Sequence, residues 1–186
     1  MTNDRRDDYG EATDVGVVRF QRLLPGPIER VWAYLTESEK RAKWFAGGEM
    51  DLRAGGQAEL KFRHANLNHH REPVPEKYRQ AEEGVAFMCE ITRCEPPRLL
   101  SFTWPEESAP ASEVTFELAP QGDRVLLVLT HRRLRDRAAM TNVSSGWHLH
   151  LDFLADQLEG QPPRPFWSTQ ARLEAEYARR LLGGAQ

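Results

Sequence analysis

One stretch near the C-terminal end, Ser145–Glu159, restricts the fold more than any other part of the chain. On a helical projection of about 100° per residue, four large apolar residues fall within one narrow stripe: Trp147, Leu151, Leu154 and Leu158. Asp152, Asp156 and Glu159 fall on the far side. The pattern predicts a helix that packs one face against something large and leaves the other face in water.

The residues before this helix supply a sheet for it to pack against. Several runs alternate apolar and polar residues with a period of two, which is typical of half-buried strands. We expect strands over Val15–Leu24, Gln57–His64, Val85–Cys94, Arg98–Trp104, Ser112–Leu118 and Arg124–His131. Two short helices should follow the first strand, beginning near Pro27 and Ser38. Short turns between successive strands favour an antiparallel sheet, so the order predicts an α+β fold whose sheet curves around the long helix.

The ends of the chain differ from this central part. Residues 1–13 are polar and charged, which predicts a disordered leader before a domain over residues 14–160. Residues 161–186 form a C-terminal extension in which Leu173, Tyr177 and Leu181 repeat at helical spacing. Asn142, Ser144 or Ser145 should cap the long helix, and Ser168 the one in the extension. The apolar stripe of the extension packs either on the sheet or on a partner subunit, and the second alternative predicts a homodimer.

Composition excludes several classes of partner. The net charge is −3, and the arginines are interleaved with acidic residues, so no clustered basic face is expected for nucleic acid. No stretch approaches the roughly 18 apolar residues of a membrane span, so no membrane partner is predicted. Cys89 and Cys94 lie five residues apart in one expected strand, where their side chains point to opposite faces. Two unpaired thiols indicate a reducing, cytoplasmic location.

Four segments together resemble a known family. They are PIERVWAYLT at residues 27–36, KWF at 43–45, DLRAGG at 51–56, and SGW at 145–147 with the leucines that follow it. In this order they resemble the helix-grip fold of the START and birch-pollen-allergen (SRPBCC) superfamily, in the branch named for the C-terminal domain of the heat-shock ATPase activator. The resemblance covers roughly residues 14–159. The loop at residues 66–84 is longer than is usual for the branch, and the extension after Gly160 is additional.

The resemblance implies a cavity between the curved sheet and the long helix. The leading hypothesis is a protein that binds a hydrophobic small molecule, lipid-like or aromatic, in this cavity. One alternative is an enzyme of the polyketide-cyclase or hydrolase type that uses the same cavity, with His64 or His150 as general base. The other is a co-chaperone-like protein-interaction domain. Because a widely shared fold does not fix a function, all three alternatives stay open at this point.

Candidate ligand-binding residues follow from their position on the expected strands and helix. Apolar residues that point inward either form a packed core or line a pocket, and the sequence does not separate the two. Trp44 and Trp104 are candidates for stacking on a ligand, and His64 and His150 for a polar contact. The complete predicted set is Trp44, Phe62, His64, Phe87, Phe102, Trp104, Phe116, Trp147, His150, Leu151 and Leu154.

Motifs for catalysis or metal binding do not occur in the sequence. There is no G-x-S-x-G, no glycine-rich phosphate loop before a helix, no H-E-x-x-H and no C-x-x-C. No catalytic residue and no cofactor are therefore assigned. His64, His69, His70 and Glu72 suggest a metal site, but their spacing matches none of the common ligand sets, so no metal is predicted.

Overall fold

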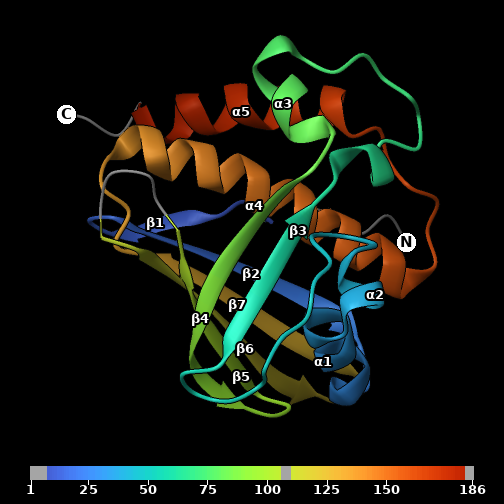
Figure 1. Cartoon of the computed structure of the whole chain (residues 1–186), viewed down its shortest axis with the longest axis vertical. Helices are drawn as coiled ribbons and strands as arrows, with labels where there is room; N and C mark the ends of the chain where they lie inside the picture. The colour runs from blue at the N-terminus through green and yellow to red at the C-terminus, as the bar shows by residue number, and fades with distance from the viewer. Residues whose placement is uncertain (1–7, 106–109, 183–186) are drawn as a thin grey trace.

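The computed structural model describes residues 8–105 and 110–182 of the chain. Its centre is a curved antiparallel sheet of seven strands in the order β1-β2-β7-β6-β5-β4-β3 (Figure 1). The strands are β1 Glu11–Asp14, β2 Val17–Pro25, β3 Gln57–Phe62, β4 Val85–Glu95, β5 Leu99–Trp104, β6 Ser112–Gln121 and β7 Arg124–Arg132. Successive strands from β3 to β7 are neighbours, which confirms the predicted meander.

The helices lie outside the sheet. They are α1 Ile28–Thr36, α2 Ser38–Arg41, α3 Arg79–Glu82, α4 Arg137–Glu159 and α5 Trp167–Leu182. In Figure 1, α4 runs across the sheet, and α5 lies beside α4 on the side away from the strands. Two short 3₁₀ turns, His64–Asn66 and Glu76–Tyr78, interrupt the connection from β3 to β4. This arrangement is the predicted α+β helix-grip architecture.

The core lies between the sheet and α4. On β7, the third strand in the order, Val125, Leu127 and Leu129 are buried, and Leu129 is opposite Phe20 of β2 and Phe116 of β6. Leu151, Leu154 and Leu158 of α4 are also buried, together with Trp147. The apolar stripe therefore packs on the sheet, as its spacing predicts.

Helix α4 begins earlier than the sequence suggests. The carboxylate of Asp136 accepts a hydrogen bond from the backbone N–H of Ala139 at 2.8 Å, which caps a helix that starts at Arg137. The predicted caps Asn142, Ser144 and Ser145 lie inside the helix instead. Gly160 ends it in the left-handed conformation, with φ of 67°, as expected for a glycine after a helix.

The acidic side of α4 is not in water, contrary to expectation. Asp152 is 6% exposed and Asp156 is 4% exposed, because the segment after Gly160 folds back over them. Arg164 pairs with both carboxylates, at 2.7 Å for Asp156. Arg22 of β2 approaches Asp152 at 3.4 Å. The two carboxylates are buried together with their counter-ions, which is the usual condition for buried charge.

The C-terminal extension packs on the same chain. Leu173 and Tyr177 of α5 are completely buried, and the ring of Tyr177 lies 6.3 Å from that of Phe20 in β2. The Tyr177 hydroxyl also hydrogen-bonds Nδ1 of His148 in α4, at 2.9 Å. Two residues of the predicted stripe, Leu173 and Tyr177, are therefore buried against the same chain, while Leu181 is only partly buried. The homodimer stays a prediction.

Regular structure is present before the predicted boundary at residue 14. Glu11–Asp14 forms β1 and pairs with β2, and the backbone N–H of Gly10 donates to the Tyr177 hydroxyl at 2.7 Å. The aromatic ring of Tyr9 packs between His148 and Tyr177. Charged residues flank these contacts, so the segment gives no apolar pattern in the sequence. Residues 1–7 of the predicted leader lie outside the described residues.

No helix in the described part of the chain has both the length and the apolar character that a membrane span requires.

Candidate functional site

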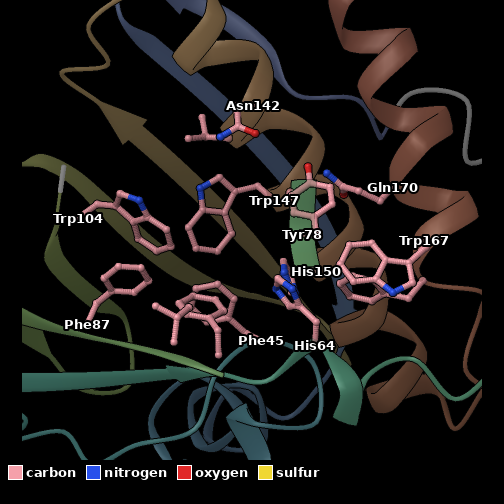
Figure 2. A pocket seen from close by; sticks show the side chains of 15 residues that line it. Phe45, His64, Tyr78, Phe87, Trp104, Asn142, Trp147, His150, Trp167 and Gln170 are labelled. Atoms are coloured by element: carbon pink, nitrogen blue, oxygen red, sulfur yellow. The ribbon is translucent and has the colours of Figure 1, made fainter. Parts of the chain in front are cut away.

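A cavity of about 240 Å³ lies between the sheet, α4, α5 and the connection from β3 to β4. Figure 2 shows its side chains converging from these elements. Val85 and Asn142 are its exposed members, whereas Phe45, Trp147 and His150 are buried. The described lining residues are Phe45, Phe62, His64, Tyr78, Val85, Phe87, Trp104, Asn142, Val143, Gly146, Trp147, His150, Phe166, Trp167 and Gln170.

Tilted and edge-on aromatic rings from three strands, α4 and the segment before β3 form one wall of the cavity. The ring centres of Trp104 and Trp147 are 5.6 Å apart, and the ring of Phe45 lies 4.9 Å from Trp147. Phe62 is 6.0 Å from both Phe87 and Trp104. These separations are within the range of favourable ring contacts, so the wall is stabilised by its own packing.

A buried polar chain holds Trp147 in this wall. The indole N–H of Trp147 donates to Nδ1 of His131 on β7 at 3.1 Å. Nε2 of His131 therefore carries the proton of the neutral ring and donates to the Ser112 hydroxyl on β6 at 2.7 Å. Burial lowers the pKa of His131 to about 3, which keeps the ring neutral and preserves this direction of hydrogen bonding.

Phe45 reaches the cavity because Arg41 organises the segment around it. The Arg41 side chain is 2% exposed and donates to the carbonyls of Thr36 at 2.9 Å and Ala46 at 2.8 Å, and also to that of Gly48. These bonds satisfy a buried guanidinium with backbone oxygens alone. Burial lowers the Arg41 pKa to about 10, so the group stays charged at neutral pH. The chain between the acceptors turns, and Phe45 points into the pocket.

Two histidines lie next to each other in the pocket. Nδ1 of His150 donates to the backbone carbonyl of Trp44 at 2.7 Å, so Nε2 of the neutral ring is a hydrogen-bond acceptor. Burial, and then the neighbouring His64, lower the pKa of His150 to about 4. The ring centres of His64 and His150 are 6.2 Å apart. Burial also lowers the pKa of His64, so both rings are neutral at pH 7.

The connection from β3 to β4 and the start of α5 close one end of the cavity together. The Glu72 carboxylate accepts hydrogen bonds from the backbone N–H groups of Trp167 at 2.6 Å and Ser168 at 3.2 Å. It thus caps α5 from 95 positions away, which replaces the predicted Ser168 cap. Nε2 of His70 donates to the Pro163 carbonyl at 2.9 Å, on the segment before this helix.

Tyr78 adds a second contact between the same two segments. Its ring stacks on Trp167 with centres 5.1 Å apart, and its hydroxyl donates to the Glu174 carboxylate. Lys77 pairs with the other oxygen of Glu174 at 2.6 Å. The long connection and the C-terminal extension, which are the two segments that depart from the family pattern, therefore meet each other over the cavity.

The free energy of unfolding should decrease as the pH is lowered, because of the buried histidines. His131, His148 and His150 have folded-state pKa values of about 3, 3 and 4, with burial as the main cause. In the unfolded chain they titrate near pH 6.5. Between about pH 4 and 6.5 the unfolded state therefore binds more protons. We expect urea unfolding to show a loss of about 2 kcal/mol for each histidine between pH 7 and pH 5, and a constant free energy of unfolding would contradict the assignment.

A family model supports the sequence-based assignment. The model of the Activator of Hsp90 ATPase homolog 1-like protein family matches residues 25–159. The chain belongs to this family. The family is part of the SRPBCC superfamily, as the four sequence motifs predict.

Solved structures resemble this member of the family over most of its length. The solution structure of the protein encoded by gene BPP1335 from Bordetella parapertussis is 48% identical, with a TM-score of 0.81, and the match covers 94% of this chain and 91% of that one. The crystal structure of CalU16 from Micromonospora echinospora is 26% identical, with a TM-score of 0.65, covering 94% and 93%. None of the curated proteins matches the chain.

DynU16, a protein in the dynemicin biosynthetic locus, shares the fold. Its crystal structure is 22% identical, with a TM-score of 0.61, and the match covers 82% of this chain and 51% of that one.

In this member of the Activator of Hsp90 ATPase homolog 1-like family, six of the predicted site residues line the cavity: Phe62, His64, Phe87, Trp104, Trp147 and His150. Phe102 and Phe116 pack with each other in the core, with ring centres 6.3 Å apart, and Leu151 and Leu154 are completely buried there. Trp44 lies behind Phe45, and its indole N–H donates to the Tyr34 carbonyl at 2.8 Å. Its backbone carbonyl, which accepts from His150, is what contributes to the site.

Most of the lining residues that sequence reasoning missed come from outside the sheet and α4, and the others are Val85, Asn142, Val143 and Gly146. Phe166, Trp167 and Gln170 come from the extension, beyond the part of the chain that the family model covers. Tyr78 comes from the long connection, and Phe45 from the segment that Arg41 organises. The aromatic neighbours KWF and PFW in the sequence were the available signals, since adjacent large rings in a loop need a surface to cover them.

The residues that suggested a metal site are used differently. His64 lines the cavity, His70 donates to the Pro163 carbonyl, and Glu72 caps α5. Each of these three side chains therefore has a different contact partner.

Proposed function

We propose that the protein binds an aromatic small molecule in the cavity between the sheet, α4 and α5. The observation that carries this proposal is the arrangement of rings around an open volume, with Trp104, Trp147 and Phe87 toward one side and Trp167 toward the other (Figure 2), where Phe166 lies 4.7 Å from Trp167. Flat aromatic surfaces favour a ligand that stacks or packs edge-on against them. Family membership supports the position of the site, while the choice of an aromatic ligand rests on these side chains.

The size of the cavity restricts the ligand further. Its volume of about 240 Å³ exceeds the roughly 150 Å³ of an engineered cavity that binds benzene, and it lies just below the lower end of common ligand pockets. A molecule of one or two rings therefore fits this space. We consequently prefer an aromatic ligand to a lipid-like one.

Naphthalene is a suitable probe of this proposal, and Gly146 offers a way to fill the cavity. A Cβ atom built on Gly146 meets nothing within 4 Å, although the residue lines the cavity on the α4 side. A leucine there should occupy the space and favour the helix at the same time. We expect Gly146→Leu to weaken naphthalene binding at least about tenfold, measured by quenching of tryptophan fluorescence, without lowering the melting temperature.

The matched control is Ala138→Leu, an exposed position on the same helix. It adds the same side chain outside the cavity and should bind naphthalene like the unmodified protein. Saturable 1:1 binding that both variants retain would place the ligand elsewhere, and no saturable binding to the unmodified protein would refute the proposal.

The histidines support binding better than general-base catalysis. A general base works best when its pKa is near the operating pH, whereas burial lowers the His150 pKa to about 4. The cyclase or hydrolase alternative depended on His64 or His150 as the base. The co-chaperone-like alternative rests on the resemblance alone, and both stay predictions.

A further inference from the structure

The polar atoms of the cavity point to a more specific ligand. Nε2 of His150 is an acceptor, because Nδ1 donates to the Trp44 carbonyl at 2.7 Å. Nδ1 of His64 is buried and has no hydrogen-bond partner among residues 8–105 and 110–182. Both rings contact Phe166, with centres 5.2 Å away for His64 and 6.0 Å for His150. The two histidines thus form a polar site beside the start of α5.

Gln170 extends this polar site. It is 7% exposed, and its amide nitrogen donates to the Ser145 hydroxyl at 3.2 Å and to Glu174 at 3.1 Å. These bonds fix the orientation of the amide, and its oxygen is left buried and unpartnered within the described structure. A buried acceptor without a donor is unfavourable, so a group that donates a hydrogen bond to it is favoured at this position.

Aromatic rings surround the pocket, whereas three of its polar side chains lie toward one end of it. In Figure 2 the rings of Trp104 and Phe87 lie toward one side, while His64, His150 and Gln170 lie toward the other, near Trp167. The described lining side chains are aromatic, aliphatic, imidazole, amide or phenol groups. A carboxylate on a ligand would therefore be buried without a cationic side chain among the described lining residues.

We infer that the ligand is an uncharged hydroxylated aromatic molecule, whose ring packs on the Trp104 side and whose hydroxyl donates a hydrogen bond to one of the acceptors formed by His64, His150 and Gln170. This inference rests on the proposed function and narrows it to phenols and naphthols. An uncharged hydroxyl satisfies a buried acceptor without bringing a charge into the pocket.

Naphthalene, 2-naphthol and 2-naphthoate provide the test, since they share a ring system and differ in one group. At pH 7 we expect 2-naphthol to bind about three- to tenfold more tightly than naphthalene, the value of one net hydrogen bond. Binding of 2-naphthoate should not be detectable. Dissociation constants from tryptophan quenching, repeated by equilibrium dialysis, give the ratio of the two affinities.

Variants then identify the acceptor. The ratio should approach one in the variant among His150→Phe, Gln170→Leu and His64→Phe that removes the acceptor of the ligand hydroxyl, because one hydroxyl donates one hydrogen bond. His69→Phe makes the same exchange at an exposed residue outside the cavity lining and should leave the ratio unchanged. The comparison of naphthalene with 2-naphthol in the unmodified protein keeps the test valid if one of these variants fails to fold.

The outcomes distinguish a failure of the hydroxyl inference from a failure of the proposed aromatic-binding function. If naphthalene and 2-naphthol bind with equal affinity, the aromatic site stands and the hydroxyl inference is overturned. The same conclusion follows if all three variants keep the full ratio. If neither compound binds, both the inference and the proposed function fail.

Discussion

Asp152→Asn should lower the free energy of unfolding by about 3–5 kcal/mol, the usual effect of removing one partner from a buried ion pair. The Asp152 carboxylate is 6% exposed and lies between Arg22, whose side chain is 4% exposed, and Arg164. Asparagine keeps the shape but removes the charge, so the buried guanidinium of Arg22 loses its counter-ion. Urea unfolding at pH 7 measures the change.

Asp51→Asn is the matched control. Asp51 pairs with Arg53 at 2.8 Å, but both side chains are at least half exposed. Its loss should cost less than about 1 kcal/mol, because water solvates both groups. If the two variants were equally stable, the pairs around Asp152 would not contribute to docking of the segment after Gly160.

Tyr177→Ala should destabilise the protein by a similar amount, about 3–5 kcal/mol. The ring of Tyr177 is completely buried between α4 and β2, and its hydroxyl bonds both Gly10 and His148. The truncation would create a void and leave the Gly10 N–H without its acceptor. Thermal and urea unfolding of the variant measure the cost.

Leu181→Ala lies on the same apolar stripe but only partly buried, and it serves as the comparison. It should cost about 1 kcal/mol. A Tyr177→Ala variant as stable as Leu181→Ala would contradict the intramolecular docking of α5. It would favour the alternative that the stripe packs on a partner subunit.

Local patterns were sufficient to predict most of the sheet and the packed face of α4. Alternation over Gln57–Phe62 identifies an inward side, and Phe62 indeed points into the cavity. Trp147 and His150 were also found, because helical spacing determines which side of α4 faces the sheet. These predictions need only the neighbouring residues of the sequence.

The division between core and cavity could not be predicted in this way. Phe116 and Trp147 are both inward-facing, and their rings are 5.8 Å apart, yet only Trp147 belongs to the lining. The difference arises from how far the elements stand apart, which depends on the whole packing. The prediction that the acidic side of α4 faces water was wrong for a related reason. Arg22 and Arg164 lie outside the helix, and only the tertiary fold brings them to Asp152.

The hydrogen-bonded chain from Trp147 through His131 to Ser112 has a mechanical consequence. It connects α4 to two adjacent strands through directional bonds, whereas apolar contacts alone would let the helix slide or turn by a small amount. Any such displacement would leave the buried indole N–H and both imidazole nitrogens without hydrogen-bond partners. Trp147 is therefore held in one position and orientation in the aromatic wall, which fixes the α4 side of the pocket.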